Sequence, residues 1–257
     1  MYKYTLENKV VVVSGGTKGI GKGVVIAAAE SGAKVVFGGR DDPAGLKIVD
    51  DLALRGMNAE YIHTDLRNVA EIMNLFEQTM KRHGKIDGFV NYAGVTNIAS
   101  MIDCDERTFD LIFDVNVKAA FFASQYAMKC MMSNDNGGSI VIFGSPHDDK
   151  GQENRAAYAV SKAAVSVMVT HMAKYYAKYR IRTNYITPGW TPTEGELSLR
   201  KQEGLTEDEL RKMAAREIPI GRMSEVEDHV PAVLYLLSDL SQVVTGSNIR
   251  VTGGLFF

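Results

Sequence analysis

Short apolar runs alternate with longer segments of helical periodicity from one end of the chain to the other. Continuous runs of β-branched and aromatic residues are typical of strands buried on both faces of a parallel sheet. The predicted strands cover residues 9–14, 34–37, 59–63, 88–91, 139–143, 182–186 and 247–251. The predicted helices cover residues 24–30, 43–55, 69–83, about 105–132, 156–179 and 225–238. This alternation predicts the α/β class: a doubly wound parallel sheet between two helical layers, in a single domain over residues 1–257.

A glycine-rich turn joins the first predicted strand to the first predicted helix. It reads Gly15-Gly16-Thr17-Lys18-Gly19-Ile20-Gly21. Its glycines allow a tight turn in which backbone amides and the helix N-terminus can hold a pyrophosphate. Because the turn lies in a strand-helix-strand unit near the N-terminus, it indicates a dinucleotide-binding Rossmann fold. Ligands of such sheets bind at the carboxyl ends of the strands, so we expect the functional site there.

The last predicted helix contains a proline. Ser224 and Glu227 have the spacing of a capping box, which predicts a helix start beside them. Pro231 lies deep in the same segment and disfavours an unbroken helix. We therefore expect this helix either to begin later or to bend.

Tyr158 and Lys162 lie four residues apart in the apolar helix predicted over residues 156–179. At that spacing both side chains leave the same face of the helix. A free phenol has a pKa of about 10, and a nearby ammonium group lowers it. The pair could then transfer protons near neutral pH, although on its own this spacing is also common in ordinary helices.

Composition excludes several classes of function. Of the 257 residues 46% are apolar and 23% charged, and the net charge is −2 without a basic tail, so no nucleic-acid partner is expected. Neither a signal peptide nor a membrane-spanning run is evident, which predicts a cytoplasmic protein without a membrane partner. Cys104 and Cys130 fall in or beside predicted helices and are expected as buried thiols. The histidines show no metal-ligand spacing, so no metal is expected.

Four further features agree in order and spacing with one protein family. Ser14 opens the glycine-rich turn with a hydroxyl, and a helical asparagine, Asn116, follows in the chain. Ser145 lies thirteen residues before Tyr158. The turn after the fourth strand reads Asn91-Tyr92-Ala93-Gly94. In these motifs the whole chain resembles the short-chain dehydrogenase/reductase family, with tyrosine at 92 where the family has a second asparagine.

The resemblance implies a catalytic set and a nicotinamide cofactor. In the family pattern Ser145 steadies the charge on the substrate oxygen, and Tyr158 gives or takes the proton. Lys162 would lower the Tyr158 pKa and bind the nicotinamide ribose, while Asn116 would hold a water of a proton relay. The cofactor-binding residues implied are Gly15, Thr17, Lys18, Gly19, Ile20, Gly21, Arg40, Asp65, Leu66, Asn91, Ala93, Gly94, Tyr158, Lys162, Pro188, Gly189, Thr191 and Thr193.

The end of the second strand predicts which cofactor is preferred. Gly39 stands where family members that prefer NAD carry an aspartate, and Arg40 follows it. Arginine suits a phosphate, and Lys18 adds a second cation, so NADP(H) is the predicted cofactor. Asp41 and Asp42 could pair with Arg40, which keeps NAD(H) as an alternative.

The substrate contacts are predicted at two charged segments, residues 146–150 and a lid over about 190–216. Ser145, His147, Tyr158 and Trp190 are the predicted contacts, with Glu194 and Glu196 as further candidates. These side chains suit a polar compound such as a sugar or polyol. A lid helix capped by Thr206 and Glu209 also has an apolar face that could cover an acyl chain instead; its members are Leu210, Met213 and Ala214.

Two rival functions remain open at this stage. A 3-oxoacyl acyl-carrier-protein reductase would need a basic docking surface, for which the candidates are Lys174, Lys178, Arg180 and Arg182. A nicotinamide-sensing regulatory protein would keep the fold without the chemistry. We expect a small-molecule substrate and, by the resemblance, a homo-oligomer, either a tetramer or a dimer, with Phe256 and Phe257 at an interface. The main prediction is an NADP(H)-dependent oxidoreductase that interconverts a secondary alcohol and a ketone.

Overall fold

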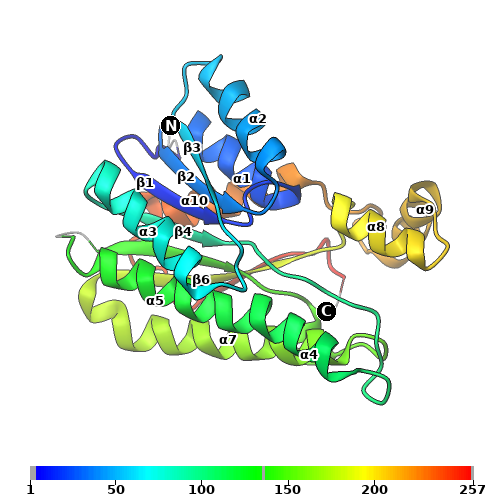
Figure 1. Ribbon diagram of the computed structural model, residues 1–257. Coiled ribbons are helices and arrows are strands. Elements are labelled where there is room, and N and C mark those ends of the chain that lie inside the picture. The colour runs from blue at the N-terminus through cyan, green and yellow to red at the C-terminus, as the bar shows by residue number, and fades with distance from the viewer. Residues whose placement is uncertain (1–3, 135–136, 256–257) are drawn as a thin grey trace.

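The computed structural model describes residues 4–134 and 137–255, so Phe256 and Phe257 lie outside these ranges. Within them a parallel sheet of seven strands has the order β3-β2-β1-β4-β5-β6-β7, with helices on both faces (Figure 1). The strands are β1 (Val10–Ser14), β2 (Lys34–Gly39), β3 (Ala59–His63), β4 (Gly88–Asn91), β5 (Gly138–Phe143), β6 (Ile181–Pro188) and β7 (Asn248–Val251). The predicted doubly wound fold is confirmed.

Alternating side chains of each strand fill two separate cores. Val11 and Val13 face the helices α1 (Gly19–Glu30), α2 (Asp42–Ala53) and α10 (Val226–Leu237). Val12, between them, faces the other layer, which consists of α3 (Val69–His83), α5 (Ala119–Met131) and α7 (Ala156–Tyr176). Burial on both faces explains why the strands are almost continuously apolar.

Helix α1 begins at Gly19, five residues before the predicted start. The glycine-rich turn itself forms the first turn of the helix, and a Cβ atom at Gly21 would lie 2.2 Å from the carbonyl oxygen of Gly15. Only glycine fits at this point. Because glycine has a low helix propensity, the sequence predicts a later start for α1 than the structure shows.

The predicted helical region over residues 105–132 consists of three parts. Helix α4 (Glu106–Phe113) and helix α5 are joined by a π-helical turn, Asp114–Lys118. The buried side chain of Asn116 lies in this turn and bonds outside the helix, to Val95 and Ser161. A π-helical turn inside a helix is a recurrent mark of a functional position.

Helix α10 corrects two sequence predictions. Its capping box consists of Glu225 and Asp228. Ser224, the predicted cap, donates instead to the carbonyl oxygen of Trp190 at 3.2 Å. The helix begins at Val226 and continues as one element through Pro231, so the strong burial of its apolar face outweighs the lost hydrogen bond.

The lid is helical and stands to one side of the sheet, beyond the carboxyl ends of the strands (Figure 1). It contains α8 (Glu194–Gln202) and α9 (Glu207–Glu217), and the predicted capping box of Thr206 and Glu209 is confirmed. Among the described residues no helix is both long and apolar enough to cross a bilayer. Cys104, which precedes α4, and Cys130, in α5, form no disulfide and are half-buried, not buried as predicted.

Candidate active site

Ser145, Tyr158 and Lys162 converge at the carboxyl end of β5. Ser145 follows that strand and is buried, and its hydroxyl is close enough to the Tyr158 phenol to lower the pKa of the phenol. The Lys162 ammonium lies 5.7 Å from the centroid of the Tyr158 ring and donates to the carbonyl oxygen of Phe143 at 3.1 Å. The structure therefore brings Ser145, Tyr158 and Lys162 together, as the sequence predicts.

Burial controls the proton affinities of this cluster. It raises the pKa of the Tyr158 phenol, against the Ser145 hydroxyl, which lowers it, and it lowers the pKa of Lys162 to about 8. The predicted lowering of the Tyr158 pKa by Lys162 is not observed, because desolvation disfavours both charged forms in this site. Tyr158 is consequently protonated at neutral pH.

Asn116 ties the catalytic helix to the turn after β4. Its Oδ1 accepts from the amide of Val95 at 2.8 Å, and its Nδ2 donates to the Val95 carbonyl at 2.9 Å and to the Ser161 hydroxyl at 3.0 Å. Gly94 lies between the Asn116 side chain and the Lys162 ammonium, since a Cβ atom there would be 3.4 Å from the first and 3.3 Å from the second. Asn116 thus fixes the floor of the site beside Lys162.

The glycine-rich turn packs against the ends of β1 and β4. Ser14 donates to Asn91 Oδ1 at 2.6 Å in the buried sheet, so the serine keeps the hydroxyl that the motif requires. A Cβ atom at Gly15, whose φ is +75°, would lie 2.9 Å from the backbone nitrogen of Ala93. These two contacts hold the predicted cofactor residues Asn91 and Ala93 directly beside the turn.

Two oxygen atoms occupy the N-terminus of α1. The Glu194 carboxylate, from the lid, accepts from the Gly19 amide at 3.1 Å, and the Tyr92 phenol hydrogen-bonds the backbone of Ile20. Tyr92 fills the position of the missing second asparagine and packs over Gly19 and Gly21. Amides that already hold a carboxylate can hold a pyrophosphate, so the turn fits a dinucleotide.

Gly39 and Arg40 shape the predicted adenosine end. A Cβ atom at Gly39 would lie 2.7 Å from Thr17 Cγ2, so a larger residue there would require the Thr17 side chain to move. Asp41 pairs with Lys18 at 2.8 Å, and Asp42 accepts from Tyr61 and contacts His63. The expected pairing of these aspartates with Arg40 is therefore wrong, and exposed Arg40 makes no ion pair with any described residue.

The remaining predicted cofactor residues lie at neighbouring strand ends. The Asp65 carboxylate holds the Arg67 guanidinium, which keeps the pKa of Asp65 at about 2, and Leu66 is partly buried beside it. Gly189, next to Pro188, donates to the carbonyl of Val251 at 2.7 Å. Thr193 caps α8 over Gly19. The Thr191 hydroxyl bonds Ser224 and buried His229, whose pKa burial lowers to about 4.

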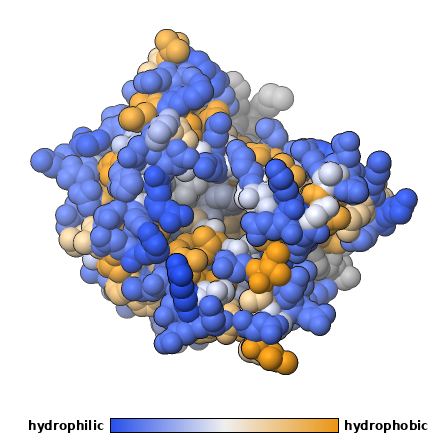
Figure 2. Space-filling view, turned by 45° about the vertical axis from the view of Figure 1, so that its right-hand side comes forward, coloured by the Kyte–Doolittle hydropathy of each residue, from blue (hydrophilic) through white to orange (hydrophobic). Residues whose placement is uncertain are grey.

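The face of the molecule in Figure 2 is hollowed beside the lid, and hydrophilic as well as hydrophobic residues border the hollow. The His147 ring lies 6.2 Å from that of Tyr158, and burial lowers its pKa, so it is neutral at pH 7. Trp190 donates through Nε1 to Glu196 at 2.8 Å. Glu194, a candidate substrate contact, turns instead to the glycine-rich turn because the α1 amides attract its charge.

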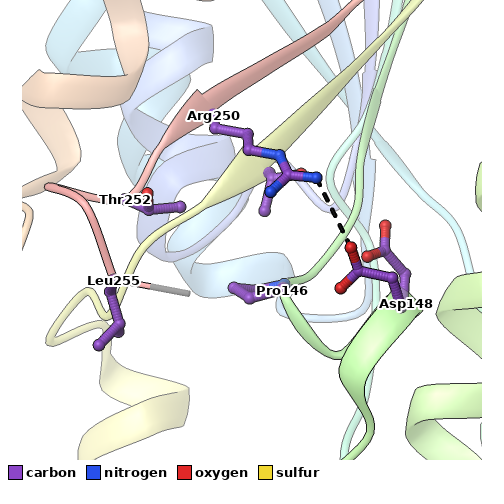
Figure 3. A pocket seen from close by; sticks show the side chains of 7 residues that line it. Pro146, Asp148, Arg250, Thr252 and Leu255 are labelled. Atoms are coloured by element: carbon purple, nitrogen blue, oxygen red, sulfur yellow. Dashed lines mark ion pairs between the residues drawn. The ribbon is translucent and has the colours of Figure 1, made fainter. Parts of the chain in front are cut away.

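The acidic residues of the loop after Ser145 are used within the fold. They line a small pocket with Pro146, Thr187, Arg250, Thr252 and Leu255 (Figure 3). The Tyr185 hydroxyl donates to the carbonyl oxygen of Lys162 at 3.5 Å, and Asp149 lies 3.6 Å from the Arg250 guanidinium. The ion pair ties this loop to β7.

Comparison with known proteins extends over the whole chain. A family model described as enoyl-(acyl carrier protein) reductase matches residues 15–256. The chain is also 33% identical over 251 residues to the 3-oxoacyl acyl-carrier-protein reductase of Thermotoga maritima, covering 97% of this chain and 98% of that protein. The chain belongs to the short-chain dehydrogenase/reductase family. It is thus a member of a family of NAD(P)-dependent oxidoreductases that act on CH–OH groups.

Other members of the short-chain dehydrogenase/reductase family are similar to the same extent. The 2-dehydro-3-deoxy-D-gluconate 5-dehydrogenase of Escherichia coli K12 is 30% identical over 251 residues, covering 98% of this chain and 96% of that protein. A crystal structure of a putative NAD(P)-dependent gluconate 5-dehydrogenase from Beutenbergia cavernae, with NADP bound at low occupancy, superposes with a TM-score of 0.89 and 29% identity, covering 98% of each chain.

Proposed function

We propose that this protein is an NADP(H)-dependent oxidoreductase that interconverts a secondary alcohol and a ketone on a polar substrate such as a sugar or polyol. The observation that carries the proposal is the convergence of Ser145, Tyr158 and Lys162, with the Lys162 ammonium 5.7 Å from the centroid of the phenol ring. This cluster lies near a glycine-rich turn that fits a dinucleotide.

Each side chain has a task that its surroundings support. The Ser145 hydroxyl would hold the substrate oxygen, and Tyr158 would donate a proton to it or accept one from it. Lys162 would contact the cofactor ribose and, with Asn116, keep the turn at Gly94 in place. The nicotinamide, when bound, would supply or accept the hydride. Because burial raises its pKa, the Tyr158 phenol carries its proton at neutral pH, which favours ketone reduction there.

A polar substrate is favoured over an acyl carrier protein by two observations. The apolar lid residues Leu210 and Ala214 are fully buried within the lid, against Ile218 and Met223, so they do not line the hollow. Of the basic docking candidates, Arg182 is bonded to Ser241 and to the carbonyl of Leu236. The others lie near the far end of α7, with Lys178 roughly 30 Å along the helix from Tyr158.

The preference for NADP(H) rests on Arg40. Arg40→Ala should raise the dissociation constant of NADPH about tenfold or more and leave that of NADH unchanged, because a guanidinium contact to the 2′-phosphate is a charge-assisted hydrogen bond. Fluorescence titration of both cofactors measures this. Arg82→Ala is the matched control, because it removes an exposed cation on α3, far from the glycine-rich turn. Equal weakening of NADPH and NADH would contradict the assignment.

Glu194 should oppose cofactor binding, since its carboxylate occupies the Gly19 amide at 3.1 Å. Glu194→Gln removes a negative charge from the pyrophosphate position, so we expect NADPH to bind about three- to tenfold more tightly. Calorimetric titration with NADPH checks this, with the exposed lid residue Glu217→Gln as the control. Unchanged or weaker binding by the Glu194 variant would show that the contact does not compete.

The proposed function is tested by initial rates of NADPH and NADH oxidation over a panel of keto-sugars, simple ketones and 3-oxoacyl thioesters. We expect turnover of polyhydroxy ketones with NADPH. Turnover confined to the thioesters would indicate a 3-oxoacyl acyl-carrier-protein reductase instead. Tight NADPH binding without turnover of any compound would favour a regulatory sensor.

A further inference from the structure

Arg155 is a buried cation that the proposed chemistry does not use. It immediately precedes helix α7, three residues before Tyr158, and its side chain is only 4% exposed. One guanidinium nitrogen, Nη1, donates to Thr96 Oγ1 at 3.1 Å. The other, Nη2, is buried and has no hydrogen-bond partner. A buried guanidinium with unused donors is unfavourable unless a ligand completes its hydrogen bonds.

The nearest acid does not complete them. Glu203, which directly follows the lid helix α8, approaches Nη2 only to 3.8 Å, which is beyond hydrogen-bonding distance. Its other oxygen accepts from Arg200 at 2.8 Å, and the same arginine also donates to Glu196 at 2.7 Å. The lid acids are therefore bonded to a lid arginine, and Arg155 faces this group with Nη2 lacking a hydrogen-bond partner.

The backbone of Arg155 is fixed on the substrate side of Tyr158. Ala99, in the segment after β4, forms a parallel bridge with Arg155, and its amide donates to the Asn154 carbonyl at 2.9 Å. The guanidinium is close enough to the phenol that it lowers the pKa of Tyr158, against the larger effect of burial, and it also lowers that of His147. Arg155 thus lies on a rigid wall next to two predicted substrate contacts.

We propose that Arg155 binds a carboxylate of the substrate through Nη2, its nitrogen without a hydrogen-bond partner, so that the protein acts on hydroxy acids and keto acids of the sugar-acid type. This inference rests on the proposed oxidoreductase function and names its substrate class. The planar guanidinium can donate two parallel hydrogen bonds to the two oxygens of a carboxylate. A single hydroxyl group of a neutral sugar cannot accept both.

A monovalent acid fits this position better than a phosphate ester. The four charged side chains around it, Arg155 and Arg200 with Glu196 and Glu203, already balance, and His147 is neutral. Arg155 Nη2, the one guanidinium nitrogen described above without a hydrogen-bond partner, can bind a group with one negative charge. A dianion would meet the Glu203 carboxylate without a second unpaired cation to offset it.

The test compares gluconate with glucitol, which differ only by a carboxylate in place of a hydroxymethyl group. With NADP⁺ as cofactor, the wild-type protein should prefer gluconate in kcat/KM by about 10- to 100-fold, the effect of one charge-assisted hydrogen-bonded contact. Arg155→Met should reduce this preference to within about threefold, and Arg155→Lys should retain an intermediate part of it, because an ammonium lacks the fork. Gluconate binding to the NADP⁺ complex, measured by calorimetry, should weaken in parallel.

Glu203→Gln separates this role from anchoring of the lid. If Arg155 only holds α8 in place through Glu203, this variant should lose activity on both compounds, as Arg155→Met would. If Arg155 binds the carboxylate, Glu203→Gln should keep or increase the preference for gluconate. NADPH affinity and the thermal midpoint report whether each variant is folded.

Three results would overturn the inference: equal use of gluconate and glucitol by the wild type, equal loss of both in Arg155→Met, or a preference for glucitol 6-phosphate over gluconate. Each of these leaves the oxidoreductase proposal intact, because each requires turnover. Absence of turnover with every ketone and alcohol would instead reject the proposed function itself.

Discussion

Tyr158→Phe should lower kcat by about 10²- to 10⁴-fold, the usual contribution of a positioned proton donor. The variant keeps the ring that packs against His147 and removes only the hydroxyl beside Ser145. NADPH should bind with unchanged affinity, since the turn at the N-terminus of α1 is untouched. Steady-state rates together with a fluorescence titration of NADPH measure the two effects separately.

Tyr179→Phe is the matched control, because this exposed tyrosine follows the far end of the same helix region. It should behave as wild type. The assignment of Tyr158 as proton donor fails if Tyr158→Phe retains a rate within a few-fold of wild type. A parallel loss of NADPH affinity would instead indicate a structural role for the phenol.

Gly144→Ala should lower the free energy of unfolding by about 3 kcal/mol, at the upper end of the usual cost of overpacking a core. A Cβ atom at Gly144 would lie 1.7 Å from Cζ of the Tyr185 ring, so that buried ring must move. The Tyr185 hydroxyl also donates to the carbonyl oxygen of Lys162 at 3.5 Å, and Ser145 directly follows Gly144 in the chain. The substitution should therefore disturb the catalytic serine as well as stability.

Urea unfolding, with the slope checked for two-state behaviour, measures the stability change. Gly195→Ala is the control, because in helix α8 a Cβ atom at Gly195 meets open space apart from the Thr193 hydroxyl at 4.0 Å. That variant should be neutral or slightly stabilised. If Gly144→Ala unfolds at the same urea concentration as wild type, the described packing of Tyr185 under the serine loop is wrong.

Much of the fold follows from local sequence signals. The apolar runs place all seven strands within two residues of their observed ends, because a strand buried on both faces leaves an unmistakable composition. Helix α3 is predicted with its observed ends, since Asn68 caps its start and Gly84 adopts the left-handed conformation at its end. The start of α1 is missed, because its glycines disfavour a helix locally while the packing of the turn requires one.

Features that the sequence does not predict depend on contacts between segments far apart in the chain. The π-helical turn at Asn116 depends on the distant partners Val95 and Ser161, so no local pattern reveals it. The spacing of Tyr158 and Lys162 predicts their proximity, but the direction of the Tyr158 pKa shift depends on burial by other elements.

The lid contacts also bridge distant segments. The position of Glu194 on the Gly19 amide joins residues 175 apart in the chain, and the unpartnered donor of Arg155 is evident only in three dimensions. A charged lid predicts solvated side chains, whereas the structure uses several of these charges to attach the lid to the site. The homo-oligomer stays a prediction.

The most direct test of the proposed chemistry is the fate of deuterium from NADPH labelled at C4 of the nicotinamide during reduction of a keto-sugar acid. With deuterium at both C4 positions, we predict one deuterium on the new carbinol carbon, detected by mass spectrometry and located by NMR. Tyr158→Phe should form far less of this labelled product in the same time. Deuterium on a carbon that was part of a C=C bond would indicate enoyl reduction. Product without deuterium would contradict the proposed hydride transfer between nicotinamide and substrate.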